Sequence, residues 1–294
     1  MKLNDLITRL KTDIDSSQRL YLLASPHKEM LRDLYTNTDT YRAPLFEKTH
    51  LESLSHASPW LCEIKEHSAI QKMFEQNAKA KTGWQGILIY APAEVSFSRL
   101  ITLLRNRLFV KFGNEQKGVL HYQLPAVAHY LLSESSKADT LEWMNCISAI
   151  IWHSPLAGIQ DEAAWRVQTN QTTENHLRVE ANSQDYALTQ TQQAALKIGP
   201  IDQLILNWQK SEQVQLDLSE FKNIRAQMLQ AEALKLFNNS KMTHLFFQAV
   251  YQHPDQADKL LAQLKKLDDP QRLSLLERMQ QQDMELHNQS STST

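Results

Sequence analysis

The sequence predicts an α+β protein, with a mixed α/β N-terminal lobe around one sheet and an all-helical C-terminal lobe. Residues 1–185 alternate short apolar segments typical of strands with longer segments of helical period. From Leu188 onwards the pattern is almost continuously helical, so we place the boundary near residue 187. The chain has 294 residues, of which 42% are hydrophobic, enough to bury a substantial core.

Five short segments are predicted to form the N-terminal sheet. Each is rich in aliphatic or aromatic residues and is bounded by turn-forming or charged residues. They are Leu20–Ser25, Leu61–Ile64, Ile87–Tyr90, Leu108–Phe112 and Val119–Tyr122. Gly113, Asn114 and Gly118 separate the last two, which indicates a hairpin. Trp165–Thr169 and Leu177–Ala181 could pair as a further hairpin.

Helical periodicity occurs between these strands and at the N-terminus. The first segment has apolar residues at helical spacing from Leu3 to Ile14, which is unlike a signal peptide. The other helices predicted in this lobe are Lys28–Tyr35, Ala69–Lys79, Ser96–Arg107 and Thr140–Trp152.

The second lobe, residues 188–286, is predicted to contain short helices only. Thr189 is a candidate N-cap of a helix Gln190–Lys197, and Ser219 is a candidate N-cap of a helix Glu220–Phe237. Pro200 is expected to start a separate helix, Ile201–Lys210. The remaining helices are Met242–Tyr251, Pro254–Lys266 and Pro270–Met284. The tail 287–294 has no apolar residue and is predicted to be disordered.

Composition argues against several classes of function. The net charge is −2 with both signs interleaved, which disfavours nucleic-acid binding. Apolar runs are too short to span a membrane. The 6 glycines form no phosphate-binding loop, and scattered His and Cys residues form no metal-site spacing. We therefore expect no cofactor, no metal, no nucleic acid and no membrane partner, and a monomer in a reducing cytoplasm.

One pair of residues could indicate catalysis. Cys146 and His153 are seven residues apart, which would place them on one face of the predicted helix Thr140–Trp152. Because Cys146 lies in an apolar stretch, a buried structural thiol is the favoured interpretation, and Cys62 is interpreted in the same way. An uncharacterised hydrolase or transferase with a helical regulatory lobe remains the alternative, since catalytic groups can assemble from distant parts of a chain.

Several segments of the first lobe occur in an order that resembles a known family. They include Arg19–Pro26, Pro44–Glu47, Ser58–Ile64, Gly83–Tyr90 and the helix containing Leu104-Arg105. This order resembles the Tap-type effector adaptor, or chaperone, family of bacterial type VI secretion. Thr189–Gln193 also looks like the start of that family's helical region. One departure is at His121–Pro125, where the family has an Arg-aromatic-aromatic-Asp-Pro segment; here Tyr122 and Pro125 match, but the Arg and Asp are missing.

The resemblance implies a non-enzymatic adaptor that binds a toxic effector protein and helps load it onto the VgrG spike protein. Such binding needs anchor residues at the surface, and aromatic residues are the usual anchors. The candidates for partner binding are Trp60, Trp84, Tyr122, Pro125, Phe246 and Phe247. Of the two adjacent phenylalanines, we expect one to point away from the core of its helix.

Overall fold

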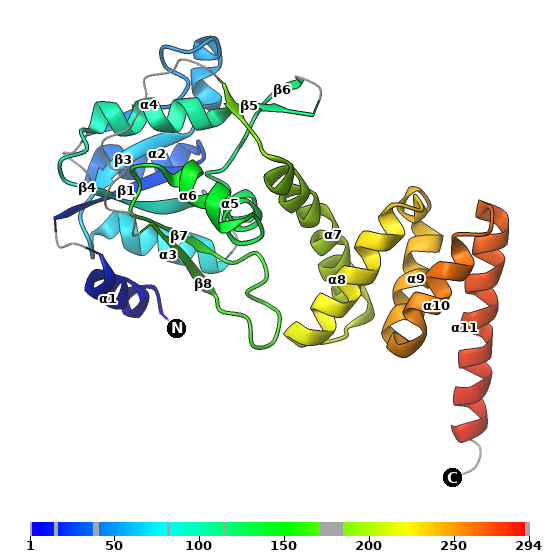
Figure 1. The fold of residues 1–294 in the computed structure, drawn as a ribbon. Coiled ribbons are helices and arrows are strands. Elements are labelled where there is room, and N and C mark those ends of the chain that lie inside the picture. The colour runs from blue at the N-terminus through cyan, green and yellow to red at the C-terminus, as the bar shows by residue number, and fades with distance from the viewer. Residues whose placement is uncertain are drawn as a thin grey trace. The chain divides into compact units, whose positions relative to one another are not determined.

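The computed structural model describes residues 2–14, 17–37, 41–80, 83–113, 116–170 and 185–291. The chain forms two compact units (Figure 1). Unit 1 comprises Met1–Gly158 and Ala163–Lys197, and unit 2 comprises Ile159–Glu162 and Ile198–Thr294. Unit 1 combines strands and helices, and unit 2 is built from helices, so the predicted α+β class is confirmed.

Unit 1 is organised around a six-stranded sheet in the order β2-β3-β1-β4-β7-β8. Every neighbouring pair in it is antiparallel. The strands are β1 (Gln18–Ala24), β2 (Arg42–Pro44), β3 (Trp60–Ile64), β4 (Gly86–Pro92), β7 (Ala149–His153) and β8 (Trp165–Thr169). All residues of β4 and β7 are buried, because helices cover both faces of the sheet.

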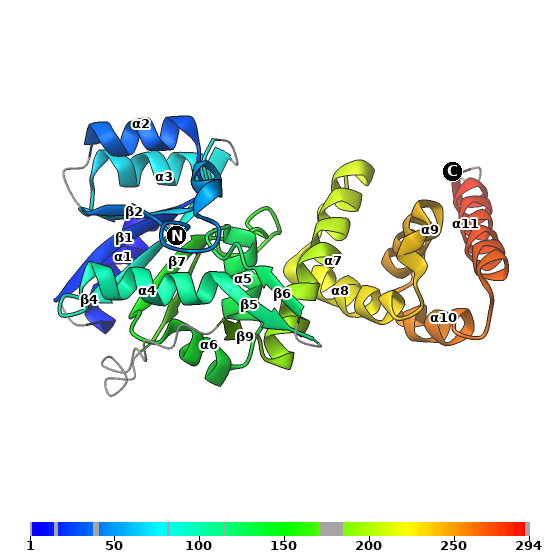
Figure 2. The same ribbon diagram turned by 90° about the horizontal axis from the view of Figure 1, so that it is seen from above.

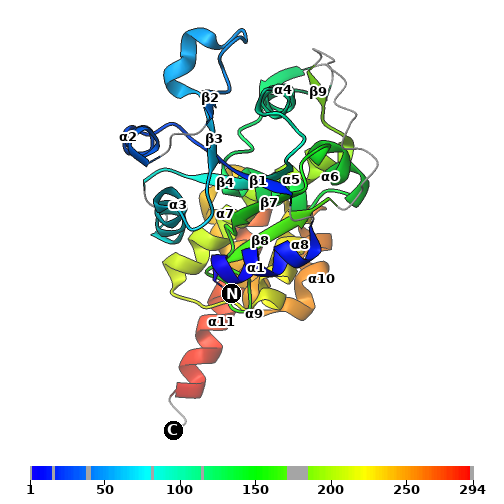
Figure 3. The same cartoon turned by 90° about the vertical axis from the view of Figure 1, so that its left-hand side faces the viewer.

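Helices form two layers that cover this sheet. They are α1 (Leu3–Asp13), α2 (Lys28–Asn37), α3 (Ala69–Ala80), α4 (Phe97–Leu108), α5 (Pro125–Ser133) and α6 (Lys137–Met144). Helices α1, α2 and α3 bury their apolar residues on one face, and α4, α5 and α6 on the other. Figure 2 and Figure 3 show α2 and α3 on the opposite side of the strands from α4. Along β1, Leu20 and Leu22 face the first layer while Tyr21 and Leu23 face the second, as strand geometry requires.

A smaller three-stranded sheet has the order β6-β5-β9. Strands β5 (Phe109–Phe112) and β6 (Gln116–Val119) form an antiparallel hairpin, and β9 (Tyr186–Ala187) runs parallel to β5. A hairpin was predicted here, but its second strand is Gln116–Val119 and not the predicted Val119–Tyr122. The prediction that this hairpin joins the main sheet was wrong. Because β5 follows directly from α4, the hairpin starts in the helical layer above the sheet and pairs with β9 instead.

The predicted helix Thr140–Trp152 is correct only for its first part. Helix α6 ends at Met144, where Asn145 takes a positive φ of 51°. The chain then enters β7, whose two faces are both buried. Cys146 and His153 therefore do not share a helical face. Of the second predicted hairpin, Trp165–Thr169 is confirmed as β8, while Leu177–Ala181 lies outside the described residues.

From Gln190 onwards the chain forms helices, as predicted, with altered boundaries, and the first of them begins in unit 1 and continues into unit 2. They are α7 (Gln190–Glu212), α8 (Leu218–Glu232), α9 (Ser240–Gln252), α10 (Ala257–Leu264) and α11 (Asp269–Ser291). The short 3₁₀ segments are η1 (Glu52–Ala57) in unit 1, and η2 (Leu236–Asn238) and η3 (Pro254–Gln256) in unit 2. Pro200 lies inside α7 rather than at the start of a new helix. The cap of α8 is Asp217, not Ser219: the Glu220 N–H donates to Asp217 Oδ1 over 2.8 Å and the Asp217 N–H donates to Glu220 Oε2 over 2.9 Å.

The compact units divide between Lys197 and Ile198, inside α7, whereas the sequence pattern changes near residue 187. The two positions differ because the first turns of α7 pack with unit 1. The helical sequence pattern shows where α7 begins, and it does not show where the chain passes from one packed unit to the other. Of the predicted disordered tail 287–294, the residues up to Ser291 continue α11, and 292–294 lie outside the described residues.

Candidate partner-binding surface

The segment that follows β2 is fixed by a guanidinium group from α4. Arg105 donates from Nε to the Leu45 carbonyl over 3.0 Å and from Nη2 to the Pro44 carbonyl over 3.1 Å. Its Nη2 also lies 3.5 Å from a carboxylate oxygen of Glu47. The planar fork of arginine suits two neighbouring acceptors, so one side chain sets the path of the Pro44–Glu47 segment.

A buried serine ties the same segment to the start of β3. The Phe46 N–H donates to Ser58 Oγ over 2.9 Å, and the Ser58 hydroxyl donates to the Pro59 carbonyl over 2.9 Å. The Leu45 N–H also donates to the Pro59 carbonyl, over 2.8 Å. Leu45 and Phe46 are buried in the core beneath α4. Two of the segments that carry the family resemblance therefore form one rigid structural element.

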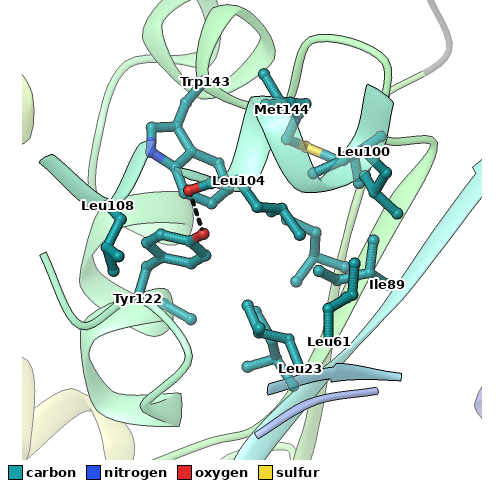
Figure 4. Close-up of a cluster of buried hydrophobic side chains, with 14 of the residues drawn as sticks. Leu23, Leu61, Ile89, Leu100, Leu104, Leu108, Tyr122, Trp143 and Met144 are labelled. Carbon is teal, nitrogen blue, oxygen red and sulfur yellow. Dashed lines mark hydrogen bonds between the residues drawn. The ribbon is translucent and has the colours of Figure 1, made fainter. Parts of the chain in front are cut away.

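Tyr122 also acts inside the protein. It is fully buried, and its hydroxyl donates to the Leu104 carbonyl over 2.7 Å (Figure 4). Its ring packs edge-on against Trp143, with 5.0 Å between ring centroids. Desolvation by burial raises the pKa of Tyr122 well above its ordinary value, so the hydroxyl remains a donor. Tyr122, which was predicted to bind a partner, thus connects α4 to Trp143 of α6 inside the core.

The other predicted anchors of unit 1 occupy different environments. Trp84 is only 2% exposed and stacks on Phe74, so it offers a partner almost no surface. Trp60 is half-buried on β3, opposite Pro44 of β2. Pro125 occupies the start of α5 and is half-buried. Only Trp60 and Pro125 of this group retain surface that a partner could touch.

In unit 2, neither phenylalanine of the predicted pair points outward. Phe246 is 0% and Phe247 2% exposed, and Phe247 stacks on Trp208 with 5.4 Å between ring centroids. Adjacent residues on a helix point about 100° apart, so both can be buried only when neighbours cover more than one side. Helix α9 packs against both α8 and α11, and two side-chain contacts join it to α11: Lys241 donates to Glu277, and Gln280 donates to Gln248.

The most exposed large apolar side chains lie at one edge of the main sheet. Tyr35 on α2 is 60% exposed, and Tyr41, directly before β2, is 66% exposed. The Tyr41 ring stacks on Phe97 with 5.6 Å between centroids, and the Arg42 guanidinium lies 4.2 Å from the centre of the Tyr35 ring. We call Tyr35, Tyr41, Arg42 and Phe97 the edge aromatic patch.

The edge aromatic patch is arranged around both faces of the edge strand. Consecutive strand residues point to opposite faces, so Tyr41 and Arg42 extend to different sides of β2. Each tyrosine is supported by a neighbouring side chain, which restricts its rotamers before any partner arrives. Sequence patterns did not identify these tyrosines, because their exposure depends on β2 being the last strand of the sheet.

Both cysteines, including Cys146, which was considered as a possible nucleophile, are buried and lack thiolate character. Burial raises the pKa of Cys62 to about 12, and it also raises the pKa of Cys146. Both thiols are therefore protonated near neutral pH. His153 lies on β7 with its ring edge-on to Trp165, 5.0 Å between centroids.

Metal-binding and membrane-spanning features are absent from the part of the chain that the structure describes. Within it, no three or more His, Cys, Asp and Glu residues cluster in a way that could hold a metal ion. Among the same residues, no helix has the length and apolar character needed to cross a membrane.

Residues 20–142 match a family model described as "Domain of unknown function (DUF4123)". This domain is found in effector adaptor proteins of type VI secretion. The matched range runs from β1 into α6 and includes Arg105, the Pro44–Glu47 segment and the edge aromatic patch. No curated protein and no solved structure matches the chain.

Proposed function

We propose that this chain is a non-enzymatic adaptor that binds a toxic type VI secretion effector and helps load it onto the VgrG spike. The match of residues 20–142 to a domain of type VI effector adaptors supports the adaptor role. The observation with most weight is the edge aromatic patch, because it lies within that range and presents two tyrosines that are more than half exposed.

The composition of the patch suits protein binding. Tyrosine and arginine are enriched among the residues that dominate interface energy, and each such anchor contributes on the order of 2 kcal/mol or more. Tyrosine loses little conformational entropy on binding, since it has two side-chain torsions, and here each ring already has a packing partner. The raised pKa values of Cys62 and Cys146 further favour binding over thiol-based catalysis.

Co-purification with the products of neighbouring effector and spike genes tests this proposal. We expect the wild-type chain to retain both the effector and the spike protein. The variants Tyr41→Ala and Tyr35→Ala should each retain less of one of these two proteins. Tyr251→Ala is the matched control, because Tyr251 is a 38% exposed tyrosine of unit 2 that also packs on another ring, that of Trp208.

The possible outcomes separate the adaptor role from the location of its surface. If the wild-type chain retains neither protein, and the effector is secreted normally without the chain, the adaptor role is wrong. If Tyr251→Ala loses a partner that Tyr41→Ala and Tyr35→Ala retain, the helical unit holds that partner and the edge aromatic patch does not.

A further inference from the structure

Helix α7 is shared between the two compact units, since they divide between Lys197 and Ile198. Its first turns are fixed within unit 1. Gln193 Oε1 accepts from the Gly113 N–H over 3.2 Å, and Gln192 donates from Nε2 to the Tyr186 hydroxyl over 3.2 Å. The Thr191 hydroxyl donates to Asp139, at the start of α6. The N-terminal part of α7 is therefore held by Gly113 directly after β5, by Tyr186 of β9 and by Asp139 of α6.

The later turns of α7 are fixed just as firmly within unit 2. Asp202 is fully buried and accepts from Arg225 of α8, with distances of 2.7 Å from Nε to Oδ1 and 2.5 Å from Nη2 to Oδ2. Two turns further on, Trp208 stacks on Phe247 of α9. Each end of α7 thus belongs to a different packed core.

Between these two anchors lie the two residues that weaken a helix most. Pro200 has no N–H for the carbonyl of Leu196, and its ring crowds that carbonyl. Gly199 precedes it, and glycine adds backbone freedom within a helix. Lys197 and Pro200 are exposed and Ile198 and Gly199 half-buried, so little packing fixes the local backbone.

We infer that α7 contains a hinge at residues 198–200, on which unit 2 reorients relative to unit 1. The weakest point of the helix coincides with the division between the units, while both flanks are anchored. Hinges are typically a few residues that absorb a change in backbone torsion. This inference concerns the chain alone and does not rest on the proposed function.

A short loop limits the same movement. Residues Ile159–Glu162, between β7 and β8, belong to unit 2 although the chain on both sides belongs to unit 1. Ile159 is 3% exposed, and the Gln160 N–H donates to the Leu216 carbonyl over 3.3 Å in a parallel bridge to Asp217. This loop is a tether, and it restricts how far the hinge can open.

Distances between two spin labels test the hinge. Lys72→Cys on α3 and Lys259→Cys on α10 provide exposed attachment sites in units 1 and 2, while the native Cys62 and Cys146 are buried. We expect the distance distribution to be narrower in the Gly199→Ala/Pro200→Ala variant than in the wild type. Lys210→Ala, at an exposed position near the end of the same helix, is the control and leaves the width unchanged.

The tether is tested by Gln160→Pro, which removes the N–H that bonds Leu216. We expect it to widen the distribution, and a width equal to that of the wild type would refute the tether. A Gly199→Ala/Pro200→Ala variant that folds normally, judged by circular dichroism and thermal midpoint, but keeps the wild-type width would overturn the hinge. Neither outcome depends on whether the chain binds an effector.

Discussion

Arg105 on α4 holds the backbone carbonyl of Leu45, a residue 60 positions earlier, through an Nε–O distance of 3.0 Å. This contact joins the helical layer to the segment that follows the edge strand β2. The edge aromatic patch includes Arg42 of the same strand, and Phe97 at the start of α4 stacks on Tyr41 of the patch. Helix α4 therefore contacts the chain on both sides of β2, through Phe97 near its start and Arg105 near its end.

Replacing Arg105 with lysine should destabilise unit 1 by about 2 kcal/mol, because hydrogen bonds from a charged group are lost and lysine cannot present a planar fork. Urea unfolding followed by circular dichroism measures the change. Arg99→Lys, at a half-buried position on the same helix, is the control and should have a smaller effect. Equal stability of Arg105→Lys and the wild type would mean that the Pro44–Glu47 segment is held by its other contacts.

Tyr122→Phe should lower the free energy of unfolding by about 1 kcal/mol, since it removes one buried hydrogen bond and keeps the ring against Trp143. We expect binding of partners by the folded protein to be unchanged. Thermal unfolding and co-purification measured on the same preparation distinguish the two effects. Loss of a partner without loss of stability would restore Tyr122 as a contact residue.

The two thiols should be unreactive in the folded protein. Burial keeps Cys62 and Cys146 protonated and inaccessible, so Ellman's reagent should find no reactive thiol in native protein and 2 after denaturation. The exposed thiol of Lys72→Cys provides the positive control. Rapid labelling of a native cysteine in the folded protein would contradict the burial and reopen the catalytic hypothesis.

Stability should fall in alkaline solution. The pKa of Cys62 is raised from 9.0 to about 12 by burial, so the folded state retains this proton where the unfolded state has lost it. The contribution of this thiol to the free energy of unfolding is complete below pH 9.0. Between pH 9.0 and about 12 it decreases by about 1.4 kcal/mol per pH unit. Urea unfolding at increasing pH measures the slope. The slope should be smaller in Cys62→Ala, although burial also raises the pKa of Tyr90.

The buried ion pair of unit 2 should be sensitive to the loss of one partner. Asp202→Leu leaves the Arg225 guanidinium buried without its carboxylate, and we expect a cost of about 3–5 kcal/mol. The double variant Asp202→Leu/Arg225→Met should recover much of this cost, because no unpaired charge remains. Chemical unfolding of the single and double variants completes the cycle. A double variant less stable than both single variants would contradict this account.

Much of the architecture follows from sequence patterns, because strands β1, β3 and β4 contain short apolar runs with clear boundaries. The failure at β7 has a definite cause. Both faces of this strand are buried, so its residues show no alternation, and periodicity cannot distinguish such a run from a buried helix. Pro200 misled the prediction of α7 because proline at a helix start and proline inside a helix look the same in one sequence.

The candidate surface was harder to predict than the fold. Aromatic residues were predicted to bind partners, yet four of the candidates are buried: Trp84, Tyr122, Phe246 and Phe247. The exposed tyrosines were missed, since exposure of Tyr41 depends on which strand ends the sheet. Sheet order is set by contacts between distant segments, and a single sequence does not encode it in any local pattern.

Helix α1 has a consequence for how this protein should be divided. It buries Leu3, Leu6, Ile7 and Leu10 against the sheet, yet it precedes the range 20–142, and β7 and β8 follow that range. A fragment cut to those limits would expose an apolar sheet face and convert β4 into an open edge prone to aggregation. The stretch defined by sequence similarity is therefore smaller than the stretch that can fold independently.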